Sequence, residues 1–294
     1  MSLCLSVSLF AGLFGAPPLR VVISEQAHGS VYKALSLLGL GKKRIEKVPS
    51  DPQGRLTAEH LPPLDGSTLV ILQAGHVSSG AFDDFDRICG LANEAQAWVH
   101  IDGAFGLWAA ASPSLQHLVT GMEKADSWCA DAHKTLNAPY DCGLVLCKDR
   151  QALKSAMAAE GSYLQESDTE RDGMFYTPDM SRRARSVDLW VTLKYLGSSG
   201  VDALVSRLVS NAQALGQQLA QLEGFTVLNE VVFNQCLVRC RSPMETAATL
   251  TALQAAGVVW CGGTQWAGEP AIRISCCSWA TTADDVRTTV QAFD

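Results

Sequence analysis

The stretch TLVILQAGHVSSGAFDDFDRICGLANEAQAWVHID, residues 68–102, decides the fold class of this chain. Residues 68–74 form a short apolar run that predicts a buried strand. Residues 83–95 carry the pattern of a helix, and residues 97–102 form a second apolar run. A strand, a helix and another strand in this order predict two parallel strands joined by a covering helix.

The same alternation of strands and helices extends on both sides of this stretch. Further strands are predicted at residues 21–24, 126–130 and 143–148, and further helices at residues 30–38 and 114–125. The chain is therefore expected to have an α/β fold with a mostly parallel sheet covered by helices.

After Arg185 the pattern changes, and a second unit is predicted. Its expected helices and strands are, in order, helices 186–196 and 201–222, strands 225–228 and 235–240, helix 244–256, strands 258–261 and 271–276, and a last helix from Ala283. Residues 1–185 are accordingly predicted to form a large domain. Residues 186–294 are predicted to form a smaller C-terminal α/β domain with a linking helix, and the polar residues 161–172 to form a mobile loop.

The composition excludes several classes of protein. In 294 residues, 47% are hydrophobic and 18% charged, which allows a sizeable buried core. A net charge of −7 argues against a nucleic-acid partner. The ten cysteines include no Cys-x-x-Cys pair, so no metal site is expected. The cysteines are expected to be reduced thiols in a cytoplasmic protein.

The apolar start, residues 1–14, does not have the features of a targeting segment. No positive charge precedes Arg20, and the run is too short to span a membrane. No signal peptide and no membrane association are therefore expected.

Two side chains at predicted strand ends point to chemistry. Asp102 ends an apolar strand, where α/β sheets bind ligands, although a helix-cap or turn role is the alternative. Lys134 follows another strand beside His133 in a weakly charged stretch, where a lysine can lose its proton and act as a nucleophile. The alternative is a solvated surface lysine. Together the two residues suggest a Schiff-base cofactor held by a carboxylate at its ring nitrogen.

Two histidines also follow predicted strands. His28 lies where a strand passes into a helix, so its imidazole could stack on a flat cofactor ring or could cap the helix. His76 lies in a stretch rich in glycine and serine, residues 75–80, which permits a tight loop near a ligand.

Six runs of sequence resemble the group II pyridoxal-phosphate (PLP) dependent decarboxylases, which include glutamate, aromatic amino-acid and diaminobutyrate decarboxylases. In detail, the amino-acid sequence is similar to that of a bacterial-type branch of that family, from about Gly12 to the C-terminus. The runs are EQAHGSVYKALSLLGLG (25–41), LQAGHVSSGAFDDF (72–85), WVHIDGAFGLWAA (98–110), ADSWCADAHKTLNAPYDCGLVLCKD (125–149), SRRARSVDLW (181–190) and AIRISCCSWATTADDV (271–286).

The resemblance implies the fold-type I PLP-dependent transferase architecture, similar to aspartate aminotransferase, and a role for each matching residue. Lys134 would form the Schiff base with PLP, and Asp102 would pair with the pyridinium nitrogen. His28 would stack on one face of the ring and Ala104 would pack on the other. His133 would lie near the cofactor phosphate or the substrate.

Three further assignments by resemblance are weaker. His76 would line the cofactor, but it replaces the Asn or Thr that related sequences carry more often. Arg273, on a strand where it faces away from Ile272 and Ile274, would bind the substrate carboxylate or else form a surface ion pair. Tyr176 would take the place of a loop tyrosine that protonates the carbanion.

The activity implied is that of an amino-acid decarboxylase, a carboxy-lyase that acts on a small-molecule substrate, and the complete protein is expected to be a homodimer. One alternative keeps the site but performs transamination or another lyase reaction. Another is a truncated, non-catalytic remnant, since the family's phosphate-binding turn of glycine and serine precedes the region that matches this chain.

Overall fold

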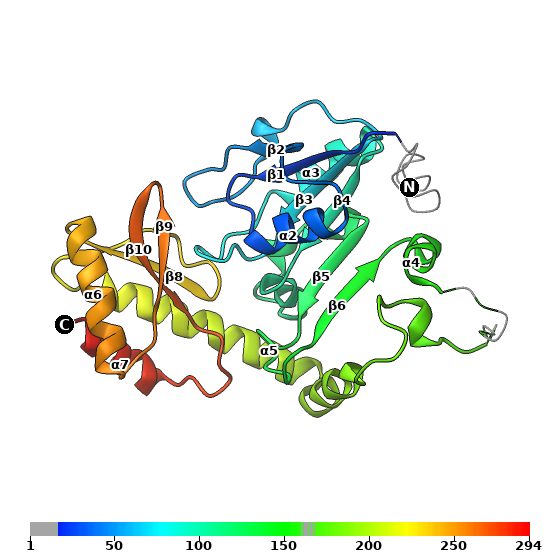
Figure 1. The fold of residues 1–294 in the computed structure, drawn as a ribbon. Helices are drawn as coiled ribbons and strands as arrows, with labels where there is room; N and C mark the ends of the chain where they lie inside the picture. The colour runs from blue at the N-terminus through cyan, green and yellow to red at the C-terminus, as the bar shows by residue number, and fades with distance from the viewer. Residues whose placement is uncertain (1–16, 160, 162–163, 165–166, 168) are drawn as a thin grey trace.

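The computed structural model describes residues 17–159, 161, 164, 167 and 169–294. The apolar start at residues 1–14 and five residues of the polar loop predicted at residues 161–172 (162, 163, 165, 166 and 168) lie outside these residues. Figure 1 shows a large sheet in one part of the chain and a smaller sheet in the other, with a long helix running between them.

The large sheet has six strands in the order β2-β1-β3-β4-β5-β6, and five of them are parallel. The predicted mostly parallel sheet is confirmed. Only β6 runs antiparallel, against β5. Strand β2 was not predicted from the sequence. The strands are β1 (Arg20–Ser24), β2 (Ile45–Val48), β3 (Thr68–Gln73), β4 (Trp98–Asp102), β5 (Ser127–Asp131) and β6 (Gly143–Cys147).

Helices cover both faces of this sheet because its strands are apolar on both sides. Helix α2 (Gly29–Leu37) places Val31 and Leu35 in a cluster with Val21, Ile23 and Ile71. Successive strand residues point to opposite faces, so the residues between these face the other way. There Val22, Val70 and Leu72 form the main core with helix α3 (Phe85–Glu94).

The helix predicted at residues 114–125 is not formed. The chain instead makes short 3-10 turns at η3 (Gln116–Val119) and η4 (Met122–Lys124), after η2 (Gly106–Ala111). Gly121 interrupts the predicted helix with a φ of 86°, a left-handed conformation that glycine adopts without strain. The other short helices near this sheet are η1 (Ala58–His60), α4 (Arg150–Met157) and η5 (Gly173–Phe175).

The second part of the chain is an antiparallel sheet of four strands in the order β7-β8-β10-β9. The strand predicted at residues 258–261 is wrong, because β9 begins at Gly262. Thr282 caps the last helix, and its side chain forms a capping box with Asp285. The elements are α5 (Arg185–Leu219), β7 (Phe225–Val227), β8 (Gln235–Cys240), α6 (Pro243–Ala256), β9 (Gly262–Trp266), β10 (Glu269–Ser275) and α7 (Ala283–Phe293).

Helix α5 joins the two parts. Gly197 has a non-helical backbone, φ 61° and ψ −175°, so α5 is two helices that meet there, as the separate predictions at 186–196 and 201–222 expected. Val201, Val205 and Val209 belong to the core of the large sheet. Further along the same helix, Ala212, Leu215 and Leu219 belong to the core of the small sheet. The domain boundary at residue 185 stays a prediction, since α5 contributes to both cores.

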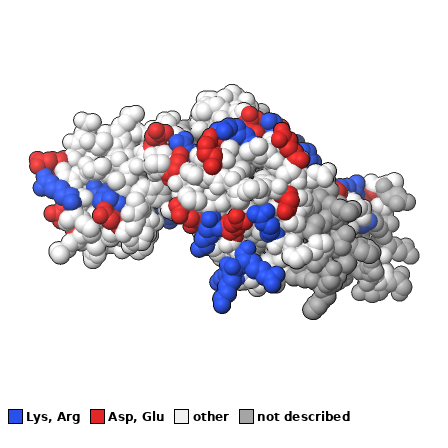
Figure 2. Space-filling view, turned by 90° about the horizontal axis from the view of Figure 1, so that it is seen from above, with Lys and Arg blue, Asp and Glu red and all other residues white. Residues whose placement is uncertain are grey.

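The surface carries charges of both signs. Figure 2 shows acidic and basic side chains side by side over the face seen from above. No helix among the described residues is both long enough and apolar enough to cross a membrane.

Replacing Gly121 by alanine is expected to lower the free energy of unfolding by about 2–4 kcal/mol. The new Cβ would overlap the backbone of Asp86 and would sit at a positive φ. Urea unfolding measures the loss. The matched control is Gly90→Ala, within helix α3 and with nothing near the new methyl group, which should keep or raise stability. Equal effects of the two variants would contradict the packing described here.

Candidate active site

Asp102 lies at the carboxyl end of β4, between the ends of β3 and β5. Parallel register pairs Asp102 with Gln73 on one side and Cys129 on the other, so these three side chains share one face of the sheet. The backbone N–H of Ala104 donates to Asp102 Oδ1 at 3.2 Å. Among the described residues, nothing donates a hydrogen bond to Oδ2 of Asp102, which leaves that oxygen open to a ligand.

The Cys129 thiol adds to the environment of Asp102. Burial raises the pKa of Cys129 to about 12, and the nearby Asp102 carboxylate adds to the effect. The thiol therefore stays protonated at neutral pH, and its Sγ lies 3.8 Å from Asp102 Oδ1 as a weak donor. Cys129 is a neutral neighbour of Asp102 and does not compete with it for a positive charge.

Lys134 follows β5 and lies at the same edge of the sheet as Asp102. Its Nζ is 2.9 Å from Oδ2 of Asp131, the last residue of β5, and 4.6 Å from the centre of the Phe105 ring. About a quarter of the Lys134 side chain, 27%, is exposed. The amino group is thus both held in place and accessible, unlike that of a solvated surface lysine.

Hydrogen bonds to two other segments fix the loop that carries Lys134. The Thr135 hydroxyl donates to the Phe105 carbonyl at 2.9 Å. The Asn137 amide donates to the Cys277 carbonyl at 2.9 Å, and its oxygen accepts from the Trp279 N–H at 3.1 Å. The segment after β10 is therefore tied directly to the lysine loop, across the two parts of the chain.

His133, the residue before Lys134, is held by the chain just before β6. Its Nδ1 lies 3.0 Å from both the backbone nitrogen and the backbone oxygen of Cys142, and its ring packs against Tyr140 with centres 4.2 Å apart. Its Nε2 lies 3.7 Å from Asp131 Oδ2. His133 and Lys134 therefore share one carboxylate, that of Asp131.

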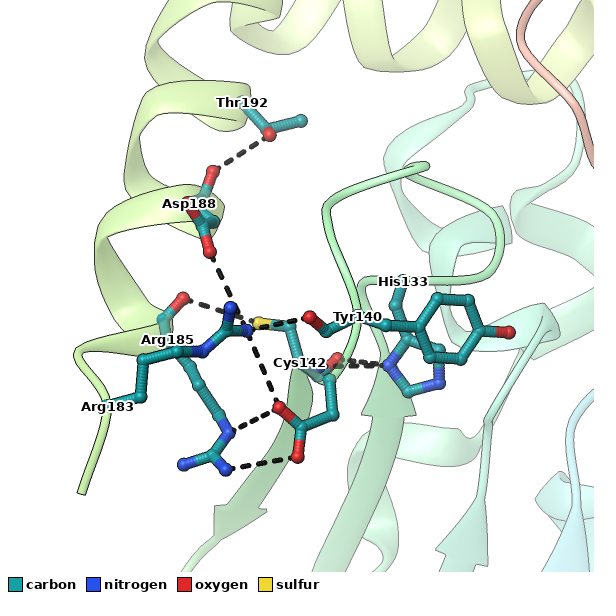
Figure 3. A network of polar contacts seen from close by, with 8 residues as sticks. His133, Tyr140, Cys142, Arg183, Arg185, Asp188 and Thr192 are labelled. Atoms are coloured by element: carbon teal, nitrogen blue, oxygen red, sulfur yellow. Dashed lines mark hydrogen bonds and ion pairs between the residues drawn. The ribbon is translucent and has the colours of Figure 1, made fainter.

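The chain around Cys142 is in turn anchored to the start of α5, as Figure 3 shows. Arg185 donates to both carboxylate oxygens of Asp141, at 2.8 and 3.0 Å. This pairing lowers the pKa of Asp141 to about 2. Arg183 donates to the Tyr140 carbonyl at 2.8 Å and lies near Asp188. Arg183 and Arg185 thus brace the loop behind His133.

His28 caps helix α2. Its Nδ1 accepts a hydrogen bond from the Ser30 N–H at 3.2 Å and lies 2.7 Å from the Ser30 hydroxyl, and the residue is exposed. Ala104 lies on the stretch after Asp102, and its carbonyl accepts from the Asp131 N–H at 3.3 Å. The roles that the resemblance gives His28 and Ala104 on the two faces of a cofactor ring stay predictions.

His76 is buried, and all its hydrogen bonds are internal. Its Nδ1 accepts from the N–H groups of Ser78 and Ser79, so the ring proton resides on Nε2, which donates to the Gln26 carbonyl at 3.2 Å. Burial lowers the pKa of His76 to about 4. In this structure His76 shapes the loop after β3, and its predicted contact with a cofactor stays a prediction.

Arg273 reaches from the small sheet toward the site. Its Nη1 donates to the Val77 carbonyl at 3.0 Å, in the loop after β3. Burial raises the pKa of the Cys277 thiol, while the charges of Arg273 and Lys134 oppose that shift, so both cations lie close to Cys277. The structure brings Arg273 to the edge of the sheet where Lys134 lies.

Tyr176 lies toward the end of the sheet opposite to the carboxyl ends of its parallel strands. Its hydroxyl accepts from Arg150 Nε at 2.7 Å, and Arg171 covers its ring at 4.2 Å. Tyr176 and Cys147 line the same surface pocket. Cys147 is the register partner of Ser127, the first residue of β5, whereas Lys134 follows the last residue of β5. The chain crosses the full length of β6 between the two positions, so Tyr176 and Lys134 are apart in this structure.

Comparison with known proteins identifies the family. Residues 17–240 match the family described as the pyridoxal-dependent decarboxylase conserved domain. The chain belongs to this family. It is 32% identical over 232 residues to the acidic amino acid decarboxylase GADL1 of Mus musculus, which covers 74% of this chain and 42% of that protein. The chain thus spans less than half the length of this curated relative.

Solved structures of the family share the fold. The crystal structure of mouse CSAD superposes with a TM-score of 0.86 at 22% identity, covering 99% of this chain and 68% of that one. A structure of Oryza sativa TDC with PLP and tryptamine has the same TM-score at 20% identity, covering 99% and 67%. The expected fold-type I architecture is confirmed.

Sequence reasoning missed three residues at the candidate site of this member of the pyridoxal-dependent decarboxylase family. Asp131 pairs with Lys134, and Asn137 ties the lysine loop to Cys277. Gln73 is buried beside Asp102, and its Nε2 has no partner within the described chain. Each has a signal in the sequence: a polar residue closes an apolar strand at Gln73 and Asp131, and Asn137 follows Lys134 closely.

The internal bonds of His76 give a test by pH. The unfolded chain takes up a proton on His76 near pH 6.5, whereas the folded chain does so only near pH 4. Stability is therefore lost as the pH falls from about 6.5 to about 4, by roughly 2–3 kcal/mol. His76→Asn should remove most of this loss, measured by urea unfolding at both ends of the range. The exposed His117→Asn is the control, and an unchanged slope in His76→Asn would contradict the assignment.

Proposed function

We propose that this chain acts as a PLP-dependent amino-acid decarboxylase, a carboxy-lyase that uses Lys134 as the cofactor lysine. The observation that carries the proposal is the position of Lys134 and Asp102 at one edge of the parallel sheet. The Lys134 amine is accessible there, and Asp102 presents an oxygen that has no hydrogen-bond partner among the described residues. Membership of the pyridoxal-dependent decarboxylase family supports the same conclusion.

The described residues fit the chemical groups of PLP. Its aldehyde requires an amine, which Lys134 supplies, and its ring nitrogen requires an anion, which Asp102 supplies. The unpaired amide of Gln73, buried on the same face of the sheet as Asp102, offers a donor at the ring edge. Bound PLP would supply the electron sink that accepts the charge left when carbon dioxide departs.

The protein's own residues would then hold and orient the reactants. Asp102 would keep a proton on the ring nitrogen, because its carboxylate is fixed by the Ala104 N–H and none of the described residues donates to Oδ2. Arg273, tied to the loop after β3, offers a guanidinium for an amino-acid carboxylate. The buried loop around His76 supports that edge through its internal hydrogen bonds.

We also propose that the protein forms a homodimer and works in the cytoplasm. The first half of α5 exposes large apolar side chains, among them Trp190 at 62% and Tyr195 at 87% exposure. Covering such a surface in a dimer would be favourable. The described cysteines are all free thiols, which suits a reducing compartment.

Incubation of the chain with PLP followed by borohydride reduction should attach the cofactor to the peptide that contains Lys134. The reason is that Lys134 is the lysine placed beside Asp102 at the carboxyl edge of the sheet. Peptide mass spectrometry measures the position of the label. Lys134→Ala should abolish it, and the matched variant Lys148→Ala should not. A label found mainly on another lysine would contradict the proposed function.

Asp102→Ala is expected to reduce carbon dioxide release from amino acids by about 10²–10³-fold or more, and Asp102→Glu by much less. The reason is that the pyridinium charge needs a nearby anion in the transition state. Rates would be measured with a panel of amino acids in the presence of excess PLP. Asp86→Ala, which removes a surface carboxylate paired with Lys124, is the control. Near-wild-type rates for both Asp102 variants would make Asp102 a turn residue only.

A further inference from the structure

A second carboxylate, that of Asp131, lies at the site beside Asp102. Asp131 is two residues after Cys129 on β5, so its side chain emerges on the face of the sheet that carries Asp102. Its Oδ2 lies 2.9 Å from Lys134 Nζ, and each of the two side chains is 27% exposed. No other carboxylate of the described residues forms an ion pair with Lys134.

The position of Asp131 is determined by its surroundings. Its N–H donates to the Ala104 carbonyl, and its carbonyl accepts from the Trp108 indole, both at 3.3 Å. On the neighbouring strand β6, Asp131 pairs with Gly143, which has no side chain. A Cβ added to Gly143 would lie 3.5 Å from Asp131 Oδ1. The carboxylate therefore has room between β5 and β6 and can reach Lys134.

Other charged groups near Lys134 do not replace this contact. His133 Nε2 is 3.7 Å from the same Asp131 oxygen, so it shares the acceptor rather than supplying one. Arg273 is a cation and lies near Cys277 on the side of the small sheet. The Phe105 ring, 4.6 Å away, offers its π face to the ammonium.

We propose that Asp131 is a positioning residue that holds the Lys134 amino group as an ammonium ion whenever the lysine is not bonded to the cofactor. The proposal rests on the proposed function. When a substrate ammonium replaces Lys134, the substrate nitrogen forms the bond to the cofactor carbon that the lysine nitrogen gives up. The hydrogens of the substrate ammonium pass to the lysine nitrogen, which becomes an ammonium and pairs with Asp131.

This pairing has a consequence for the order of events. An ammonium has no lone pair, so Lys134 cannot attack the cofactor carbon again while it stays protonated beside Asp131. The carboxylate also keeps the lysine within reach for its return once the product is ready to leave. Asp131 thereby acts through Lys134, whereas Asp102 acts on the cofactor ring.

The test uses amine labelling in the absence of PLP, so its result does not depend on the proposed function. The chain is treated with a limiting amount of acetic anhydride, and the labelling rate of each lysine is followed by peptide mass spectrometry. In Asp131→Asn, Lys134 should label about twofold to fivefold faster, because the neutral amide no longer stabilises the ammonium. Lys148 is the internal reference and should not change.

The matched control is Asp86→Asn, since Asp86 Oδ1 holds Lys124 Nζ at 2.6 Å in an equivalent pair on the surface. That variant should accelerate labelling of Lys124 and leave Lys134 unchanged. Wild-type chain in about 1 M NaCl gives a second measurement that needs no substitution, because salt screens a partly exposed pair. Lys134 should then label faster than at low salt, relative to Lys148.

An Asp131→Asn chain that labels Lys134 at the wild-type rate, while Asp86→Asn accelerates Lys124, would overturn the proposal. If Asp131→Asn unfolds, which faster labelling of every lysine would reveal, the salt series on wild-type chain decides the matter. Absence of a salt effect on Lys134 would overturn the proposal in that case. Failure of the proposed function alone would appear differently. Asp131→Asn would still accelerate the labelling of Lys134, but borohydride would not trap PLP on Lys134.

Discussion

The parallel pairing of β3, β4 and β5 is the constraint on which the site depends. Because these strands run in the same direction, their carboxyl ends meet at one edge, and register places Gln73, Asp102 and Cys129 side by side. The chain leaves β5 at the same edge and forms the loop of Lys134. Asp102 and the lysine, 32 residues apart in the sequence, therefore lie at the same edge of the sheet. Slippage of β4 by one residue would turn Asp102 to the other face of the sheet.

The second requirement is that the small sheet stays attached to that edge. Helix α5 passes from one core to the other, so the relative position of the two parts is set by apolar burial along a single helix. Polar contacts then fix the details, as Arg273 bonds the loop after β3 and Asn137 bonds the segment after β10. The lysine loop is thus held from three sides: by β5, by Phe105 and by the small sheet.

Strand and helix patterns predicted most of this architecture, because apolar runs and helical spacing report burial directly. They failed at residues 114–125, where spacing suggested a helix but Gly121 takes a left-handed backbone beside Asp86. They also missed β2, of whose four residues only Val48 is buried. Asp102 ends a strand and Lys134 follows one, so both residues could be singled out from the sequence, while their roles toward a cofactor stay predictions. The strand-end position of Asp131 is visible in the sequence, but its contact with Lys134 depends on a loop geometry that no local pattern encodes. The internal bonds of His76 likewise depend on segments 50 residues apart.

The account makes one central claim, that Lys134 and Asp102 hold the two ends of one PLP molecule. A crystal structure of the chain determined after incubation with PLP tests it most directly. The account predicts continuous density from Lys134 Nζ to the cofactor, with the ring nitrogen within hydrogen-bonding distance of the Asp102 carboxylate. PLP bound at another lysine, or bound at Lys134 with its ring nitrogen directed away from Asp102, would contradict it.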